Sequence, residues 1–288
     1  MPIELTEKKR AQLERVKELA AETGVEILAH FYQRGEVKMA ADFVGGSTRV
    51  AARALESRAP AVMVCGASFM ADEIRQRRPS INLLTPRDDL SCPLAEKVTA
   101  AEVAQAKAKH PDALVAADMK ITADLRPLVD VFISPATIND LLKREPTRPL
   151  IALPGAQLCD WAGLGERIVH RWPQAVCQVH ELALAEDLIQ AKEEHPEALV
   201  AVNLLCRPEV RALADFVGDS EGLFNFCAQR SREIIVVSEA GLAEYLSETF
   251  PDKIFHETEA EIFCPNMKLT TLKSMIARLE QFAGLHLK

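Results

Sequence analysis

The sequence lacks long apolar runs, paired cysteines and an excess of basic residues. No segment approaches the roughly 20 consecutive apolar residues that cross a bilayer, so we expect no membrane partner. The 42 Asp and Glu residues outnumber the 34 Lys and Arg residues, which argues against the clustered basic surface that nucleic acids require. The N-terminal segment is charged throughout and is typical of an amphipathic helix, not of a signal peptide, so we expect a cytoplasmic protein.

The seven cysteines include no Cys-x-x-Cys pair. This absence removes support for zinc fingers, zinc ribbons and thioredoxin-type redox motifs. A disulfide framework is not expected in a cytoplasmic chain of this size. The default interpretation of each cysteine is therefore a small buried hydrophobic residue.

What the sequence does contain is an internal repeat. ADFVGGS at residues 41–47 returns as ADFVGDS at residues 214–220, and HPDALVA at residues 110–116 returns as HPEALVA at residues 195–201. A similar turn follows a strand-like segment between these copies. The equivalent aspartates, Asp42, Asp130 and Asp215, are therefore 88 and 85 residues apart. A self-similar unit of about 86 residues therefore occurs three times.

Each unit reads as strand, helix, strand, helix, strand, and continuous Val, Ile, Leu and Ala runs favour parallel sheets covered on both faces. We expect an α/β fold of three pseudo-threefold-related α/β/α sandwich domains with small parallel sheets around a central site. The predicted domains span residues 22–106, 107–191 and 192–288, and an N-terminal helix over residues 5–22 packs on them. Ligands bind beyond the carboxyl ends of strands in such folds, so three copies facing one axis predict one shared site.

Three cysteines follow the repeat. Cys92, Cys177 and Cys264 lie 85 and 87 residues apart, at equivalent late positions in the three units. Threefold-related loops would bring these thiols together, and convergent thiolates favour zinc or an iron–sulfur cluster. The spacing leaves that choice open, and the alternative is three buried cysteines that keep register by chance.

Six segments occur in a characteristic order between Ile27 and Leu279: AHFYQ, ADFVGGS, CGASFMADE, SCPLAEKV, WPQAVCQVHE and CPNMK. Together they resemble the quinolinate synthase family of de novo NAD biosynthesis. The resemblance implies three domains of one topology, each giving one cysteine to a central [4Fe-4S] cluster, and the ligands fall on Cys92, Cys177 and Cys264. It also implies that the iron without a protein ligand acts as a Lewis acid while iminoaspartate condenses with dihydroxyacetone phosphate.

The resemblance also assigns roles to other residues. It implies catalytic roles for His30 and Tyr32, which match the family's His-x-Tyr. The positions expected to bind substrate are Ser47, Met70, Ser220 and Glu239.

Other family positions are replaced in this chain. Asp118 and Lys120 stand where the family has Tyr-x-Asn, and we predict that they form a new catalytic acid/base or ion pair. Aliphatic Leu205 replaces the Glu of the family's His-Pro-Glu-Cys segment, which removes a carboxylate from acid/base work. Asp219 puts a negative charge in a turn where the family offers hydroxyl groups. These changes predict altered specificity.

Three functions stay open at this point. The first is quinolinate synthesis, the second is the same cluster acting on another small substrate by dehydration, condensation or C–N bond chemistry, and the third is a non-catalytic iron–sulfur sensor. The third is the weakest, because an open iron with His30 and Tyr32 exceeds a structural role. We expect a small-molecule substrate, which another enzyme supplies if it is an unstable intermediate, and a monomer or homodimer.

His180 either orients the Cys177 loop or is a structural histidine. Cys206 does not fall on the repeat period and is not counted as a cluster ligand.

Overall fold

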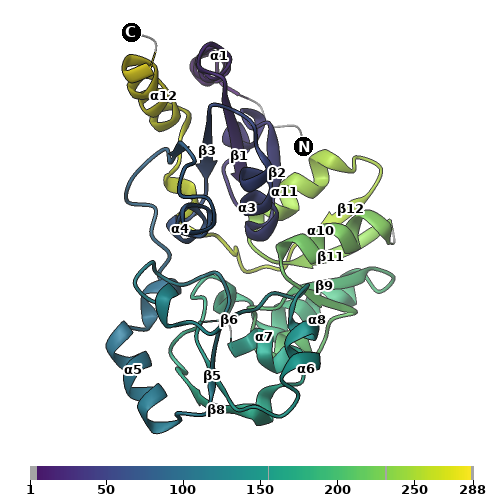
Figure 1. Ribbon diagram of the computed structural model, residues 1–288. Coiled ribbons are helices and arrows are strands. Elements are labelled where there is room, and N and C mark those ends of the chain that lie inside the picture. The colour runs from purple at the N-terminus through teal and green to yellow at the C-terminus, as the bar shows by residue number, and fades with distance from the viewer. Residues whose placement is uncertain (1–4, 155, 231, 287–288) are drawn as a thin grey trace.

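The computed structural model of the chain describes residues 5–154, 156–230 and 232–286 (Figure 1). Its strands form three four-stranded sheets in which every pair is parallel. Each sheet has the same strand order: second, first, third, fourth. The expected α/β class with three small parallel sheets is therefore confirmed.

The strands divide evenly among the three predicted units, whose end points stay predictions. They are β1 (Val25–His30), β2 (Phe43–Gly45), β3 (Ala61–Cys65) and β4 (Leu83–Leu84); β5 (Leu114–Ala117), β6 (Val131–Phe132), β7 (Leu150–Ala152) and β8 (Ile168–Arg171); and β9 (Leu199–Asn203), β10 (Phe216–Gly218), β11 (Glu233–Val237) and β12 (Ile254–His256).

Helices precede, connect and follow these strands. They are α1 (Glu7–Thr23), α2 (Gly35–Met39), α3 (Ser47–Glu56), α4 (Ser68–Arg77), α5 (Ala100–Lys109), α6 (Ile138–Arg144), α7 (Ala156–Trp161), α8 (Ala185–Glu194), α9 (Pro208–Arg211), α10 (Ser220–Gln229), α11 (Ala240–Thr249) and α12 (Leu272–His286). Short 3-10 turns are η1 (Ala95–Lys97), η2 (Arg126–Leu128), η3 (Gly165–Arg167), η4 (His180–Leu182) and η5 (Met267–Leu269). None of the helices within the described ranges combines the length and apolar character needed to cross a bilayer.

The repeated aspartates hold the first strand of each sheet. The carboxylates of Asp42, Asp130 and Asp215 accept hydrogen bonds at 2.8, 2.9 and 2.8 Å from backbone N–H groups of β1, β5 and β9, respectively. The backbone N–H of each aspartate donates back to the carbonyl of the same strand residue. The repeat therefore reflects one structural unit, and these aspartates are structural.

The two end helices belong to one core. Helix α1 starts after the Thr6 cap and ends at Gly24, whose φ of 69° suits glycine. Its buried Leu13 and Val16 share a cluster with Met275 of α12 and with β1 and β3. Figure 1 shows α1 and α12 side by side on the first sheet. The C-terminal helix thus returns to the first unit. The prediction assigned this helix to the third domain, residues 192–288, and did not include this packing.

Candidate functional site

One cavity of 340 Å³ lies where the three units meet. It opens at the carboxyl ends of the first strands, where the equivalent residues are His30, Asp118 and Asn203. Cys92, Cys177 and Cys264 all line it. The repeat therefore brings chemically different side chains to equivalent positions around one space.

The three cysteine loops share one geometry. Each thiol is half-buried and is followed within three residues by a 3-10 turn: η1, η4 or η5. The backbone carbonyl of each cysteine accepts a hydrogen bond from the N–H four residues later, at 3.3, 3.0 and 3.3 Å for Cys92, Cys177 and Cys264. This common loop presents each thiol to the cavity from a fixed backbone.

The surroundings of these thiols suit metal ligands. Burial raises the pKa of all three, that of Cys264 to about 11, and backbone N–H groups facing each sulfur act in the opposite direction. Neighbouring thiols also raise the pKa of Cys264, because Cys92 and Cys177 are close. A bound cation would favour all three thiolates, so the donor set fits a soft metal or an iron–sulfur cluster. The other four cysteines are buried and do not line the cavity: Cys65, Cys159, Cys206 and Cys227.

His30 is held as a neutral imidazole. Its Nδ1 accepts a hydrogen bond from the backbone N–H of Tyr32 at 3.1 Å. Burial, with Lys120 and Lys268 nearby, lowers its pKa to about 3. A neutral ring that accepts at Nδ1 carries its proton on Nε2, so His30 offers an N–H donor at the cavity.

The Tyr32 hydroxyl is the centre of a buried polar cluster. Ser220 Oγ and Asn203 Nδ2 donate to it at 2.7 and 3.0 Å, and Ser238 Oγ lies 3.1 Å away. Burial raises the Tyr32 pKa far above its usual range, so the phenol stays protonated. Tyr32 thus ties the first unit to the third through a hydroxyl that can still donate one proton.

His180 connects this cluster to a cysteine. Its Nδ1 lies 3.3 Å from Cys177 Sγ and its Nε2 lies 3.4 Å from Tyr32 Oη. Burial lowers its pKa to about 4, so the ring is neutral. Of the two roles left open by the sequence, this contact favours orientation of the Cys177 loop.

Asp118 and Lys120 form a pair at the cavity wall. Lys120 Nζ lies 2.8 Å from Asp118 Oδ2, and the Lys120 backbone N–H donates to Oδ1 at 3.1 Å. Burial disfavours the ammonium, but Asp118 and Asp219 outweigh it and raise the Lys120 pKa. The predicted ion pair is therefore present, and its catalytic role stays a prediction.

The equivalent turns of the first and third units carry the protein's own carboxylates. Asp219 caps α10 by accepting from the Gly222 N–H at 2.8 Å. Glu221 accepts from the Gly46 N–H at 2.9 Å, directly before α3. A β-carbon on Gly46 would lie 3.2 Å from Glu221 backbone and side-chain atoms, so the first turn favours glycine there. Both helix N-termini that could receive a substrate anion already have a carboxylate.

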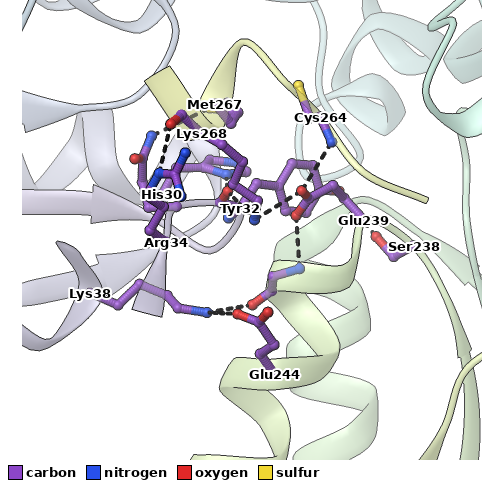
Figure 2. A network of polar contacts seen from close by, with 12 residues as sticks. His30, Tyr32, Arg34, Lys38, Ser238, Glu239, Glu244, Cys264, Met267 and Lys268 are labelled. Carbon is purple, nitrogen blue, oxygen red and sulfur yellow. Dashed lines mark hydrogen bonds and ion pairs between the residues drawn. The ribbon is translucent and has the colours of Figure 1, made fainter. Parts of the chain in front are cut away.

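Ser47 and Ser220 line the cavity as expected, but Met70 and Glu239 lie outside its lining. Met70 is fully buried. Glu239 is buried and accepts from the backbone N–H of Cys264 at 3.1 Å, while Lys268 Nζ lies 3.0 Å from the same carboxylate (Figure 2). Glu239 therefore supports the Cys264 loop, and direct substrate contact by Met70 or Glu239 stays only a prediction.

Three residues of this site were not predicted from the sequence: Ser238, Lys268 and Glu221. Ser238 follows β11 and reaches Tyr32, whereas Lys268 donates to the Tyr32 carbonyl at 2.8 Å. Lys268 ends the CPNMK segment that carries the resemblance, but that segment was interpreted only for its cysteine. Alignment of the repeat could have found Asn203, because it occupies the place of His30.

Comparisons with known proteins identify the family of this chain. The family model described as "Quinolinate synthetase A protein" matches residues 14–285. The quinolinate synthase of Thermodesulfovibrio yellowstonii is 34% identical over 272 residues, covering 93% of this chain and 89% of the relative. That of Aquifex aeolicus is 32% identical over 276 residues, covering 94% and 85%. The chain therefore belongs to the quinolinate synthase A family.

Proposed function

We propose that the cavity holds a [4Fe-4S] cluster and that the protein is a cluster-dependent enzyme of the lyase or transferase type. The observation that carries this proposal is the set of three half-buried thiols, Cys92, Cys177 and Cys264, on loops of one geometry around one cavity. No fourth cysteine lines the cavity among the described residues, so one iron would stay open to a ligand. When bound, the cluster would supply a Lewis acid that polarises a substrate oxygen.

The chain's own residues would bind the substrate and move protons. The neutral His30 would donate from Nε2 to a substrate oxygen, since its Nδ1 is already engaged. The Asp118–Lys120 pair would exchange a proton with the substrate or bind one of its polar groups. Because the Tyr32 hydroxyl is fixed by Ser220 and Asn203, it would orient the substrate and would not ionise.

We propose further that the substrate bears less negative charge than the dicarboxylate and phosphate ester of the family reaction. The cavity lining has four carboxylates and two cations: Glu73, Asp118, Asp219, Glu221, Arg77 and Lys120. Both cations are paired, Lys120 with Asp118 at 2.8 Å and Arg77 with Glu73 at 3.4 Å. Arg126 and Arg49, outside the lining, also pair with Glu73 and Glu221. A phosphate placed against this lining would therefore meet cations that carboxylates already engage, and it would compete with those carboxylates for them.

The loss of an acid/base group is a separate argument for a changed substrate. Leu204 and Leu205 line the cavity where the family has Pro-Glu, and Leu205 occupies the repeat position of Tyr32 and Lys120. An aliphatic wall cannot satisfy a polar group that a carboxylate would bind, and such mismatches change specificity by large factors. Quinolinate synthesis itself is the second candidate, favoured by the family match over nearly the whole chain.

Anaerobic purification and cluster reconstitution, followed by incubation with iminoaspartate and dihydroxyacetone phosphate, test both proposals. The Thermodesulfovibrio yellowstonii relative, assayed in parallel, is the positive control. Four irons per chain with a quinolinate rate at least about 100-fold below the control support a changed substrate. A comparable rate would establish quinolinate synthesis and overturn the changed substrate. Absence of iron and sulfide would overturn the cluster assignment.

A further inference from the structure

A second group of metal-ligand side chains lies outside the central cavity, in the third unit. His256 Nε2 lies 2.9 Å from Glu233 Oε1, and His195 Nδ1 lies 3.5 Å from the same oxygen. One ligand atom from each residue lies within 4.8 Å of the other two. None of the three residues lines the central cavity.

The backbone around this group is regular. His195 directly follows α8 and precedes β9, Glu233 begins β11, and His256 ends β12, which pairs with β11. Adjacent strands of one sheet and the loop leading into it therefore supply all three side chains. Their side chains are 20–35% exposed, so an ion could reach them from solvent.

The second unit provides an internal comparison. It has histidines at both equivalent positions, His110 and His170, but Pro149 where the third unit has Glu233, as the registers of the following strands establish. The two rings there are 6.3 Å apart and tilted by 46°. In the third unit the rings are 3.4 Å apart at 15°. Close approach of the histidine pair thus accompanies the carboxylate, and rotation of one ring out of this stacked arrangement would let both in-plane nitrogen lone pairs meet one ion.

The separations suit a divalent first-row metal. Ligands about 2.0–2.1 Å from a tetrahedral zinc ion lie about 3.4 Å from one another, near the two measured contacts with Glu233. Two imidazoles and one carboxylate leave at least one position for water, a donor set that zinc, nickel and iron accept. We propose that His195, Glu233 and His256 form a binding site for Zn²⁺ or a similar divalent metal, separate from the cluster.

Calorimetric titration of the tag-free, cluster-containing protein with ZnCl₂ under anaerobic conditions tests the site. We expect one zinc ion bound per chain, with affinity reduced at least about tenfold in His256→Ala and in Glu233→Gln. His170→Ala, at the equivalent position of the second unit, is the matched control and should bind zinc like the parent. Iron content, measured in every sample, should stay constant, so failure here is distinct from failure of the cluster assignment.

Two results would overturn the proposal: no zinc binding by the parent protein, or binding that both His256→Ala and Glu233→Gln retain. If a variant does not fold, zinc anomalous diffraction from crystals of the parent protein decides the matter. A peak about 2.0–2.2 Å from the His195, Glu233 and His256 ligand atoms supports the site, and a peak elsewhere or none refutes it.

Discussion

Replacement of Tyr32 by Phe should destabilise the protein by about 2–4 kcal/mol, although the ring is retained. The change removes the oxygen to which Ser220 Oγ and Asn203 Nδ2 donate at 2.7 and 3.0 Å. Asn203 keeps a contact with Ser238 Oγ at 3.3 Å, but the buried Ser220 hydroxyl loses the partner that the structure gives it. Two lost hydrogen bonds at about 1 kcal/mol each, plus up to about 2 kcal/mol for a stranded hydroxyl, give this range.

Urea unfolding of the parent protein and the variant measures this loss. Tyr245→Phe is the matched control, since the chain has two tyrosines and Tyr245 lies outside the polar cluster. In a double-mutant cycle, Ser220→Ala should recover at least about 1 kcal/mol in the Phe background, because it removes the stranded hydroxyl. A loss below about 0.5 kcal/mol, or an equal loss in Tyr245→Phe, would refute the reasoning.

Three further predictions concern the cavity lining and the support of the Cys264 loop. Asp118→Ala and Lys120→Ala should each lower turnover at least about tenfold with unchanged iron content, and full activity in both would contradict a role for the pair. His30→Gln should make the free energy of unfolding of the apoprotein less dependent on acid, by about 2 kcal/mol between pH 7 and pH 5. The folded-state pKa near 3 lies below the unfolded value of 6.5, so the unfolded state binds the proton first and stability falls as pH falls; an unchanged pH profile would contradict this. Glu239→Gln should speed iron loss in air by weakening support for the Cys264 loop, and an unchanged rate would contradict that role.

The fold followed from the sequence because the repeat is both local and structural. Asp42, Asp130 and Asp215 recur since each bonds the first strand of its own sheet, so their spacing revealed the three units. The same period identified the three cysteines that line the cavity. The sequence was enough to predict these features because each depends on contacts within one unit, and each copy of the unit repeats the same backbone.

Other features depend on contacts between units, which a single repeat does not encode. The Tyr32 cluster joins side chains 171 to 206 residues apart in the chain, and no spacing rule predicts it. The bond between Glu239 and the Cys264 backbone, which lies within the third unit, was likewise not predicted, and substrate contact by Glu239 stays a prediction. Helix α12 packs on the first unit because Met275 and Leu279 join one buried apolar cluster with residues of α1, β1 and β3.

Mössbauer spectroscopy of anaerobically purified, ⁵⁷Fe-enriched protein tests the central claim most directly. If Cys92, Cys177 and Cys264 hold a [4Fe-4S] cluster with one open site, the spectrum should change at one iron of four when a small oxygen ligand is added. The signal should disappear in a Cys177→Ser variant and persist in Cys206→Ser. A spectrum without a four-iron cluster, or a cluster that survives in Cys177→Ser, would contradict the account.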